Sequence, residues 1–336
     1  MTIQVIKLNR PMARSRLSSR ASIQVGFIAL DWCRPQKMFQ GPQGAPVLLD
    51  IYDHGEISLR RATRAIRLPA RTILRPMPQK AVLITGAAGR IGTALRPLLR
   101  PTYRLRLVDV RTPSEPGDDF VQADTSDLPA MQAACAGMDA VVHLAGNPNT
   151  AATWDELRVS NVDSTYCVFE AARRAGANKV ILASTNHVMG FYNLEGAYPI
   201  RVDAPIRPDS LYGVSKAFGE ALARYYSDAF EMSMICLRIG WFTPRDPTVR
   251  GLQSLWISAR DLAQVIGLCI ETPRRFGMYN ATSNNSQGHW DLQATRDELG
   301  YAPQDDVSAL NLAESGEYRE DMPYVEPPAG VLRAQT

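Results

Sequence analysis

The sequence predicts an α/β fold with a doubly wound parallel sheet, in which helices cover both faces of the sheet. Short apolar runs alternate with longer segments of helical period from Ala81 to about Asp306. The runs are apolar throughout, which is typical of parallel strands buried on both faces. The first run ends in glycines at three-residue spacing, which indicates a tight turn into a helix.

The first strand, turn and helix are predicted in the stretch AVLITGAAGRIG, from Ala81 to Gly92. Gly86 permits the turn, Gly89 lets the backbone approach a pyrophosphate, and Gly92 lets the helix pack closely on its strand. Unpaired N–H groups and the positive end of the helix dipole would then face the phosphates. Glycines that only turn the chain are the alternative, because any α/β protein can use such a loop.

A second predicted strand, 105–108, ends in Asp109, about 20 residues past the glycine turn. An acidic side chain at this position accepts hydrogen bonds from an adenosine ribose, and its charge repels a 2′-phosphate. Asp109 therefore favours NAD over NADP. Arg90 and Arg111 act in the opposite direction, because either guanidinium neutralises a 2′-phosphate. The sequence predicts NAD as the cofactor.

The remaining elements follow in order. Further strands are predicted at 120–123, 139–144, 179–183, 232–238 and 278–281. Further helices are predicted at 128–135, 154–175, 211–230, 261–272 and 290–299. Gly176 is a typical helix end, and a polar loop containing prolines precedes Ser210. The acidic tail 307–336 is expected to form a surface helix and a loose end.

Residues 1–78 form a basic extension with little predicted organisation. IQVGFIAL and APVLLDIY are candidate strands, and SLRRATRAIRL has a weak helical period. The start is rich in Arg and Ser with no acid before Asp31, which is typical of transit peptides. We favour a different interpretation, in which translation begins at Met77, directly before the first strand. Residues 1–80 carry 14 Lys/Arg against 4 Asp/Glu, and the remainder carries 23 against 30.

Composition excludes several classes of protein. The 336 residues, 45% hydrophobic and 21% charged, bury a large core in one or two domains. Five cysteines form no CxxC or Cys/His cluster, so a reduced cytoplasmic protein without a metal is predicted. No apolar run approaches the roughly 20 residues that span a bilayer. The part after residue 80 shows no basic stripe, so neither nucleic acid nor a membrane is an expected partner.

Tyr212 and Lys216, in YGVSK, lie four residues apart on one face of a predicted helix. A tyrosine with a pKa of about 10 is a poor base at neutral pH, and a neighbouring ammonium is expected to lower this pKa. Tyr212 would then take a proton from a sugar hydroxyl. Ser184 and Thr185 close a strand at the carboxyl edge of the sheet, where ligands bind. A solvated helix face and a turn-forming Ser/Thr are the alternatives.

The chain from about Lys80 to Asp306 resembles the extended short-chain dehydrogenase/reductase family. The motifs that carry this resemblance are GAAGRIG at 86–92, Asp109, Asp124, HLAG at 143–146, Asn161, YGVSK at 212–216 and RIG at 238–240. The family implies a Rossmann-type sheet, a nicotinamide cofactor and a small carboxyl-terminal substrate lobe, formed here mainly by 188–210 and 241–258. It also implies pairing of the long helices 154–175 and 211–230 across a homodimer.

The resemblance implies a set of cofactor-binding residues: Gly86, Gly89, Arg90, Ile91, Gly92, Asp109, Asp124, Thr125, Leu144, Ala145, Gly146, Tyr212, Lys216 and Ile239. In the catalytic group, Tyr212 is the base, Lys216 lowers its pKa and holds the ribose, and Thr185 orients the hydroxyl. Asn161 resembles the family's asparagine that holds a water near this lysine. His143 is expected to be a histidine at the edge of the core.

Within the family, STNHVMGFY at 184–192, RPDSLYGVSK at 207–216 and LRIGWF at 237–242 are similar to the uronate dehydrogenases, which oxidise the anomeric carbon of a hexuronate to an aldarolactone with NAD. HLAGNP and RGLQSLWIS are similar to the NAD-dependent glucose-6-phosphate dehydrogenases of the short-chain type. By this resemblance Asn186 and His187 line the sugar site with Thr185 and Tyr212, and Arg250 pairs with the carboxylate or phosphate of the substrate. A solvated loop arginine is the alternative for Arg250.

The sequence departs from the pattern at three places. Trp241 stands where uronate dehydrogenases tend to have a small polar residue, Asn147-Pro148 replaces a Ser-containing segment, and Ser164 replaces a frequent glycine. The first two lie on the inferred substrate side, which leaves the sugar open. The sequence predicts NAD-dependent oxidation of an anionic aldose at C1. A nucleotide-sugar epimerase or dehydratase, and a non-catalytic cofactor sensor, are the alternatives.

Overall fold

The computed structural model describes residues 79–114, 119–243 and 252–310, and before residue 79 only the backbone of six strands. The chain divides into two compact units, Met1–Met77 and Pro78–Thr336. The strands of the first unit are β1 (Ile3–Leu8), β2 (Ile23–Ile28), β3 (Met38–Gln40), β4 (Pro46–Ile51), β5 (Ile57–Arg61) and β6 (Arg64–Ala65). β1 pairs antiparallel with β2, and β3 to β6 form an antiparallel sheet in chain order. The helical period expected in SLRRATRAIRL is therefore wrong, because pairing of β5 with β4 overrides a weak local preference.

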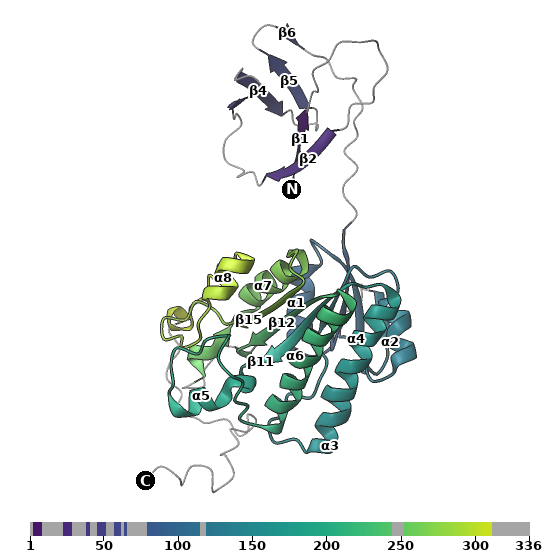
Figure 1. Cartoon of the computed structure of the whole chain (residues 1–336), viewed down its shortest axis with the longest axis vertical. Coiled ribbons are helices and arrows are strands. Elements are labelled where there is room, and N and C mark those ends of the chain that lie inside the picture. The colour runs from purple at the N-terminus through teal and green to yellow at the C-terminus, as the bar shows by residue number, and fades with distance from the viewer. Residues whose placement is uncertain are drawn as a thin grey trace. The chain divides into compact units, whose positions relative to one another are not determined.

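A seven-stranded parallel sheet forms the centre of the second unit, in the order β15-β12-β11-β10-β7-β8-β9 (Figure 1). Its strands are β7 (Ala81–Thr85), β8 (Arg104–Asp109), β9 (Asp119–Gln122), β10 (Ala140–His143), β11 (Lys179–Thr185), β12 (Ser233–Ile239) and β15 (Phe276–Ala281). β7 pairs with both β8 and β10, so the direction of winding reverses at β7. The crevice above that point is where sheets of this class bind ligands. The predicted α/β class with a doubly wound parallel sheet is confirmed.

Helices pack on both faces of the sheet. They are α1 (Arg90–Leu99), α2 (Leu128–Cys135), α3 (Trp154–Leu157), α4 (Ser164–Ala175), α5 (Gly190–Glu195), α6 (Leu211–Phe230), α7 (Ala259–Glu271) and α8 (Gln293–Leu299). One buried cluster joins α1, α7 and α8 to the sheet, and a second joins α2, α4 and α6 to its other face. Figure 1 shows α4 and α6 side by side on the face nearer to the viewer. Among the described residues, no helix is long and apolar enough to cross a membrane.

The helix that carries Tyr212 has the predicted bounds, because both of its ends have clear local causes. Ser210 caps the start, its Oγ accepting a hydrogen bond from the N–H of Gly213 at 3.1 Å. Glu231, with φ at 59°, ends it in the left-handed conformation. α4 ends in the same way at Gly176, as the sequence predicts.

Two predicted segments differ from the structure. The single helix expected over 154–175 is interrupted by a π-helical stretch, η1 (Arg158–Asp163), which the helical period does not reveal. The loop expected before Ser210 contains a 3₁₀ turn, η2 (Asn186–Met189), followed by α5. Gly196, at φ 65°, ends α5 after only two turns, so the segment is too short to show a period.

A third hydrophobic cluster contains residues from both segments of the predicted lobe. Its buried members are Val188, Met189, Ile200, Ala217, Leu255 and Trp290. A parallel bridge between Ile200 and Trp290 joins the first segment to the chain before α8. Short strands β13 (Trp241–Phe242) and β14 (Trp256–Ile257) pair with each other, and residues 244–251, which come between them in the sequence, lie outside the described residues.

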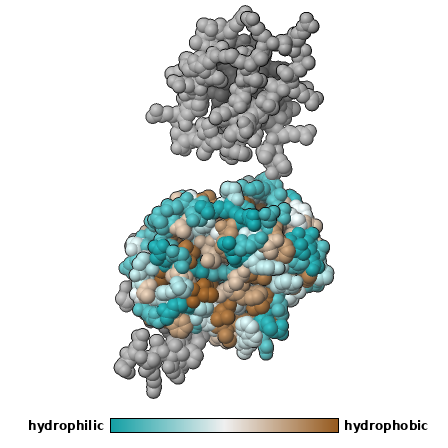
Figure 2. All heavy atoms as spheres, in the orientation of Figure 1, coloured by the Kyte–Doolittle hydropathy of each residue, from teal (hydrophilic) through white to brown (hydrophobic). Residues whose placement is uncertain are grey.

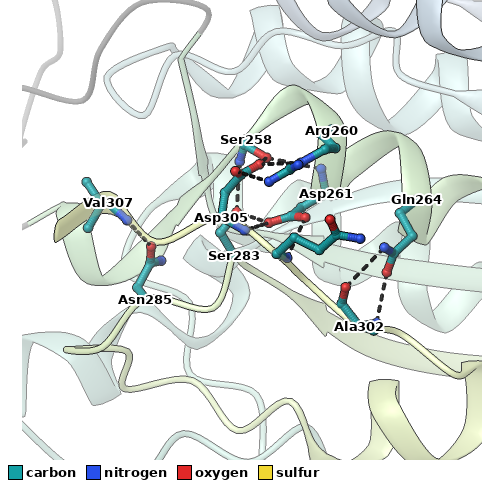
Figure 3. A network of polar contacts seen from close by, with 10 residues as sticks. Ser258, Arg260, Asp261, Gln264, Ser283, Asn285, Ala302, Asp305 and Val307 are labelled. Atoms are coloured by element: carbon teal, nitrogen blue, oxygen red, sulfur yellow. Dashed lines mark hydrogen bonds and ion pairs between the residues drawn. The ribbon is translucent and has the colours of Figure 1, made fainter. Parts of the chain in front are cut away.

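The last described segment of the chain is fixed to the start of α7 by a buried carboxylate (Figure 3). Asp261 is fully buried and accepts hydrogen bonds from the Ser283 hydroxyl at 2.6 Å and from the N–H groups of Gln304 at 2.8 Å and Asp305 at 3.0 Å. Asp305 in turn accepts a hydrogen bond from Ser258, the N-cap of α7, at 2.6 Å. This network holds the chain that leaves the sheet against the helix that covers it.

A buried ion pair connects α6 to the sheet. Arg238 of β12 is fully buried and donates two hydrogen bonds to Glu220 of α6, Nε to Oε1 at 2.9 Å and Nη2 to Oε2 at 2.8 Å. Its Nη1 donates to the carbonyl of Val202, and Ser184 of β11 donates to Glu220 at 2.7 Å. One ion pair therefore joins α6, two strands and the 188–210 segment.

We expect Arg238→Met to lower the free energy of unfolding by about 3–5 kcal/mol, because it leaves Glu220 buried without its counter-charge. Arg201→Met is the matched control. It removes an exposed partner of Asp203, at 2.9 Å, and should leave the free energy of unfolding almost unchanged, because solvent screens this pair. Urea denaturation of both variants and the wild type measures the difference. Equal losses of unfolding free energy in the two variants would show that the buried ion pair does not stabilise the fold.

Candidate functional site

Two hollows lie next to each other along the carboxyl edge of the sheet. The first, of about 350 Å³, extends from the glycine turn past Asp109 to Thr125. The second, of about 490 Å³, extends from the same turn to Tyr212 and Trp241. Five residues line both of them: Gly86, Gly89, Arg111, Leu144 and Gly146. The two hollows therefore form one continuous trough.

The described candidate residues of the sequence all line this trough. The first hollow contains Gly86, Gly89, Asp109, Asp124, Thr125, Leu144, Ala145 and Gly146. The second adds Arg90, Ile91, Gly92, Thr185, Asn186, His187, Tyr212, Lys216 and Ile239. Arg250, the expected partner of a substrate anion, lies outside the described residues.

The glycine turn is packed so closely that a side chain has no room. Gly86 has φ at 66°, and a Cβ there would lie 2.7 Å from the backbone nitrogen of Ala145. A Cβ at Gly92 would lie 2.6 Å from the carbonyl oxygen of Gly86. Gly89 is the N-cap of α1, and no side chain caps this helix. The open N-terminus of α1 therefore faces the trough with its N–H groups, which is a typical phosphate site.

Asp109 lies at the end of β8 and is oriented by two backbone N–H groups. One carboxylate oxygen accepts from Ala88 at 2.9 Å, and the other accepts from Arg111 at 2.9 Å. The Arg111 guanidinium is mostly exposed, and its Nε lies 3.7 Å from the same carboxylate. The acidic group is thus fixed at the rim of the first hollow, in the position from which a ribose hydroxyl is bound.

α6 presents Tyr212, Lys216 and Glu220 on one face, since they are spaced by four residues. All three side chains are buried. Tyr212 forms a hydrogen bond with Thr185, the last residue of β11. Glu220 is bound to Ser184 one residue earlier, so the ion pair that fixes the helix lies directly behind this hydroxyl pair.

The expected lowering of the Tyr212 pKa by Lys216 is contradicted by the structure. Burial raises the pKa of Tyr212 to about 12, and only the hydrogen bond with Thr185 lowers it. Lys216 Nζ lies 6.0 Å from the centre of the tyrosine ring. Burial also lowers the pKa of Lys216 to about 8. Desolvation of both groups therefore outweighs their mutual attraction.

His143 is a buried structural residue, as expected, and it supports the turn opposite Gly86. Its pKa is lowered to about 3 by burial and then by the charge of Lys216, so the ring is neutral. Nδ1 lies 2.8 Å from the hydroxyl of Thr85, which accepts the N–H of Ala145. Nε2 lies 3.3 Å from the Thr165 hydroxyl. The neutral ring therefore joins two buried hydroxyls, donating to one and accepting from the other.

Asn161 lies in the π-helical stretch and fixes the far side of the trough. Its Oδ1 accepts the N–H of Asn147 at 2.7 Å, and its Nδ2 donates to the carbonyl of the same residue and to Ser215. A Cβ at Gly146 would lie 3.1 Å from Asn161 Oδ1 and 3.3 Å from Lys216 Nζ. The amide therefore positions backbone beside the lysine, in addition to the water-holding role expected from the sequence.

Comparison with known proteins identifies the family. Residues 82–269 match the NAD dependent epimerase/dehydratase family. The chain belongs to that family. The resemblance inferred from the motifs is therefore confirmed, and so is NAD as the cofactor, since the family is NAD dependent by its description.

Three similar proteins show where the chain lies within the family. The NAD-dependent glucose-6-phosphate dehydrogenase of Haloferax volcanii is 37% identical over 245 residues, 67% of this chain and 93% of that protein. The uronate dehydrogenase of Pseudomonas syringae pv. tomato is 36% identical over 233 residues, 68% of this chain and 83% of that protein. A mutant uronate dehydrogenase from Agrobacterium tumefaciens, crystallised with NAD, is 35% identical with a TM-score of 0.64, covering 69% of this chain and 88% of that one.

The trough fits NAD in two respects. The glycine turn leaves space that any Cβ would fill, as close contact with a pyrophosphate requires. Asp109 is held by two N–H groups at the strand end where a ribose is bound, and the second hollow begins at the same glycines and ends at Tyr212. When bound there, NAD supplies the hydride acceptor for the reaction.

Sequence reasoning missed several residues that shape the site. Asp209 pairs with His187, Glu220 fixes α6, and Phe242 lines the second hollow beside Trp241. Glu220 continues the spacing of Tyr212 and Lys216 by another four residues, so a charged residue on a buried helix face was the available signal. For Asp209 no comparable signal exists, because it lies in a loop.

We expect Gly86→Ala to weaken NAD binding at least tenfold, since its Cβ would push the Leu144–Ala145 backbone into the trough. Gly137→Ala is the matched control. It imposes the same strain, with φ at 72°, but a Cβ there meets nothing within 4 Å. Titration calorimetry with NAD measures both, and circular dichroism establishes that each variant is folded. Equal NAD affinities in the two variants would contradict the assignment of the glycine turn as the pyrophosphate site.

We expect Lys216→Met to raise the stability of the protein at neutral pH relative to the wild type, by on the order of 3 kcal/mol. The pKa of Lys216 is lowered from 10.5 to about 8, so below about pH 8 the folded state must hold a charge that burial disfavours. As pH rises from about 8 to 10.5, only the unfolded state keeps this proton, and wild-type stability recovers.

Urea denaturation between neutral pH and about pH 10 measures this difference, with the exposed Lys80→Met as the control for loss of one charge. The advantage of Lys216→Met should shrink as pH rises. If the stability difference between Lys216→Met and the wild type does not change with pH, burial does not disfavour the charged form of Lys216.

Proposed function

We propose that the protein is an NAD-dependent dehydrogenase that oxidises C1 of an anionic aldose, with a hexuronate as the substrate and the aldarolactone as the product. The observation that carries the proposal is the hydroxyl pair of Tyr212 and Thr185 at the end of the second hollow, beside the buried Lys216. The relatives named uronate dehydrogenase, about 35% identical, support the substrate class.

Proton removal is the task of the hydroxyl pair. Thr185 orients the C1 hydroxyl of the sugar, and Tyr212 accepts its proton as the hydride leaves the carbon. Because burial raises the pKa of Tyr212 to about 12, the phenolate needs support during this step. Lys216, charged below about pH 8, and the positive charge of oxidised NAD both favour the phenolate and act against burial.

The sugar would lie against Asn186 and His187, which line the second hollow next to Tyr212. His187 packs edge-on against the Tyr212 ring, with centroids 5.6 Å apart. Trp241 adds an indole wall to the same hollow. Arg250 remains the proposed partner of the anionic group.

Glucose 6-phosphate is the second candidate substrate. The relative with 37% identity carries that name, and both sugars are anionic aldoses. An epimerase or dehydratase reaction is disfavoured, because only about 90 residues follow Lys216 before the recognisable pattern ends, which leaves little room for a lobe that holds a nucleoside diphosphate.

The proposed assembly is a homodimer. Large apolar side chains are exposed along α6 and on the helices beside it: Val214, Phe218 and Tyr225 on α6, Tyr166 on α4, and Trp154 on α3. Figure 2 shows hydrophobic residues gathered on this face of the molecule. An exposed apolar stripe on two adjacent helices is typical of an association surface.

We expect the full-length protein to form NADH with glucuronate or galacturonate, and with a lower kcat/KM for glucose 6-phosphate. Tyr212→Phe should lower kcat at least 100-fold, as loss of a general base does, while NAD affinity stays within about twofold. Tyr225→Phe, an exposed tyrosine of the same helix, is the matched control and should retain full activity.

NADH absorbance measures turnover, and calorimetry measures NAD binding. A higher kcat/KM for glucose 6-phosphate would assign the second substrate. NAD retained through turnover of a nucleotide sugar, with no NADH released, would assign an epimerase or dehydratase. Absence of turnover with any aldose, or an active Tyr212→Phe, would refute the proposed function.

A further inference from the structure

His187 and Asp209 form a close pair at the wall of the second hollow. His187 Nδ1 lies 2.9 Å from both carboxylate oxygens of Asp209. The histidine side chain is about one third exposed, and the aspartate less than one fifth. The two residues come from separate segments, the 3₁₀ turn after β11 and the residue before the N-cap of α6.

The backbone fixes Asp209 in this position. Its N–H donates to the carbonyl of His187, so the pair is joined by main chain and side chain together. Ser210 Oγ donates to Asp209 Oδ1 at 3.0 Å. A Cβ at Gly190 would lie 1.8 Å from Asp209 Oδ2, and a Cβ at Gly213 would lie 2.4 Å from the carbonyl oxygen of His187. Two glycines therefore leave the space that the pair occupies.

The pairing decides which ring nitrogen of neutral His187 carries the proton. An ionised carboxylate only accepts hydrogen bonds, so Nδ1 must be the donor toward Asp209. The other nitrogen, Nε2, then holds a lone pair. Among residues 79–114, 119–243 and 252–310, Nε2 has no hydrogen-bonding partner, and the ring lines the hollow beside Tyr212.

We propose that Asp209 is a positioning residue that holds His187 with Nε2 as a hydrogen-bond acceptor for a hydroxyl of the sugar. The proposal rests on the proposed function for its substrate. An acceptor at this point binds a hydroxyl, which donates a proton, and disfavours a group that only accepts. The pair thus makes the site selective for a sugar that has a free hydroxyl at the carbon facing His187.

Asp209→Asn separates this role from a merely structural one. In Ser–His–Asp triads the same exchange keeps the geometry and reverses the histidine tautomer. The variant should therefore present an N–H at Nε2 in place of a lone pair, so that Nε2 no longer requires a donor and no longer repels a fluorine. Asp203→Asn is the matched control, since Asp203 lies in the same segment in an exposed pair with Arg201.

The first measurement is ¹⁵N NMR of histidine-labelled full-length protein at about pH 8.5, where free imidazole is mostly neutral. His187→Gln assigns the His187 signal. We expect the proton on Nδ1 in the wild type and in Asp203→Asn, and on Nε2 in Asp209→Asn. A wild-type His187 with its proton on Nε2, or on both nitrogens, overturns the proposal without need of any variant.

The second measurement compares kcat/KM for the accepted aldose with that for its 2-, 3- and 4-deoxyfluoro forms. The preference is the ratio of kcat/KM for the aldose to kcat/KM for the fluorinated form. At the carbon that faces His187, this ratio should fall at least tenfold in Asp209→Asn and stay unchanged in Asp203→Asn. Unchanged preference at every carbon overturns the role in sugar binding. Failure of the proposed function is recognised separately, as absence of turnover with every aldose while the NMR result stands.

Discussion

The arrangement of the site depends on the buried pair of Arg238 and Glu220. A guanidinium and a carboxylate taken out of water lose their hydration, so each holds the other to one geometry. Because Glu220 lies on the same face of α6 as Tyr212 and Lys216, this pair sets the rotation of the helix about its axis. Through Ser184, it also sets the end of β11, where the reacting hydroxyls meet.

Burial at the site disfavours charged side chains, whereas the reaction needs the Tyr212 phenolate and the Lys216 ammonium. Lys216 is held where its ammonium is disfavoured, and Tyr212 is held where its phenolate is disfavoured. Perturbed groups of this kind are typical of catalytic sites, where burial and neighbouring charges shift pKa values away from their ordinary range. The neutral His143 behind them adds no positive charge, so the balance is left to the lysine and to what binds in the trough.

Local chemistry explains what the sequence predicts well. The strand and turn of Ala81 to Gly92, the capped helix from Leu211 to Phe230 and the position of Asp109 follow from apolar runs, a serine cap and glycine spacing. Features that arise only in three dimensions are absent from these patterns. The raised pKa of Tyr212 is due to desolvation by packed neighbours, and the contact of Asp209 with His187 joins residues in segments without periodicity. The prediction for Arg250 stays a prediction.

The π-helical stretch has a consequence for how this trough can change. An α-helix turns by about 100° per residue, and a π-helical turn accommodates one residue more than an α-helical turn does. Deletion of a single codon between Arg158 and Asp163 would restore a regular helix and swing the Asn161 amide away from the Asn147 backbone. The apolar face of α4 would stay in register, so a single inserted residue accounts for the wall of the trough beside Lys216.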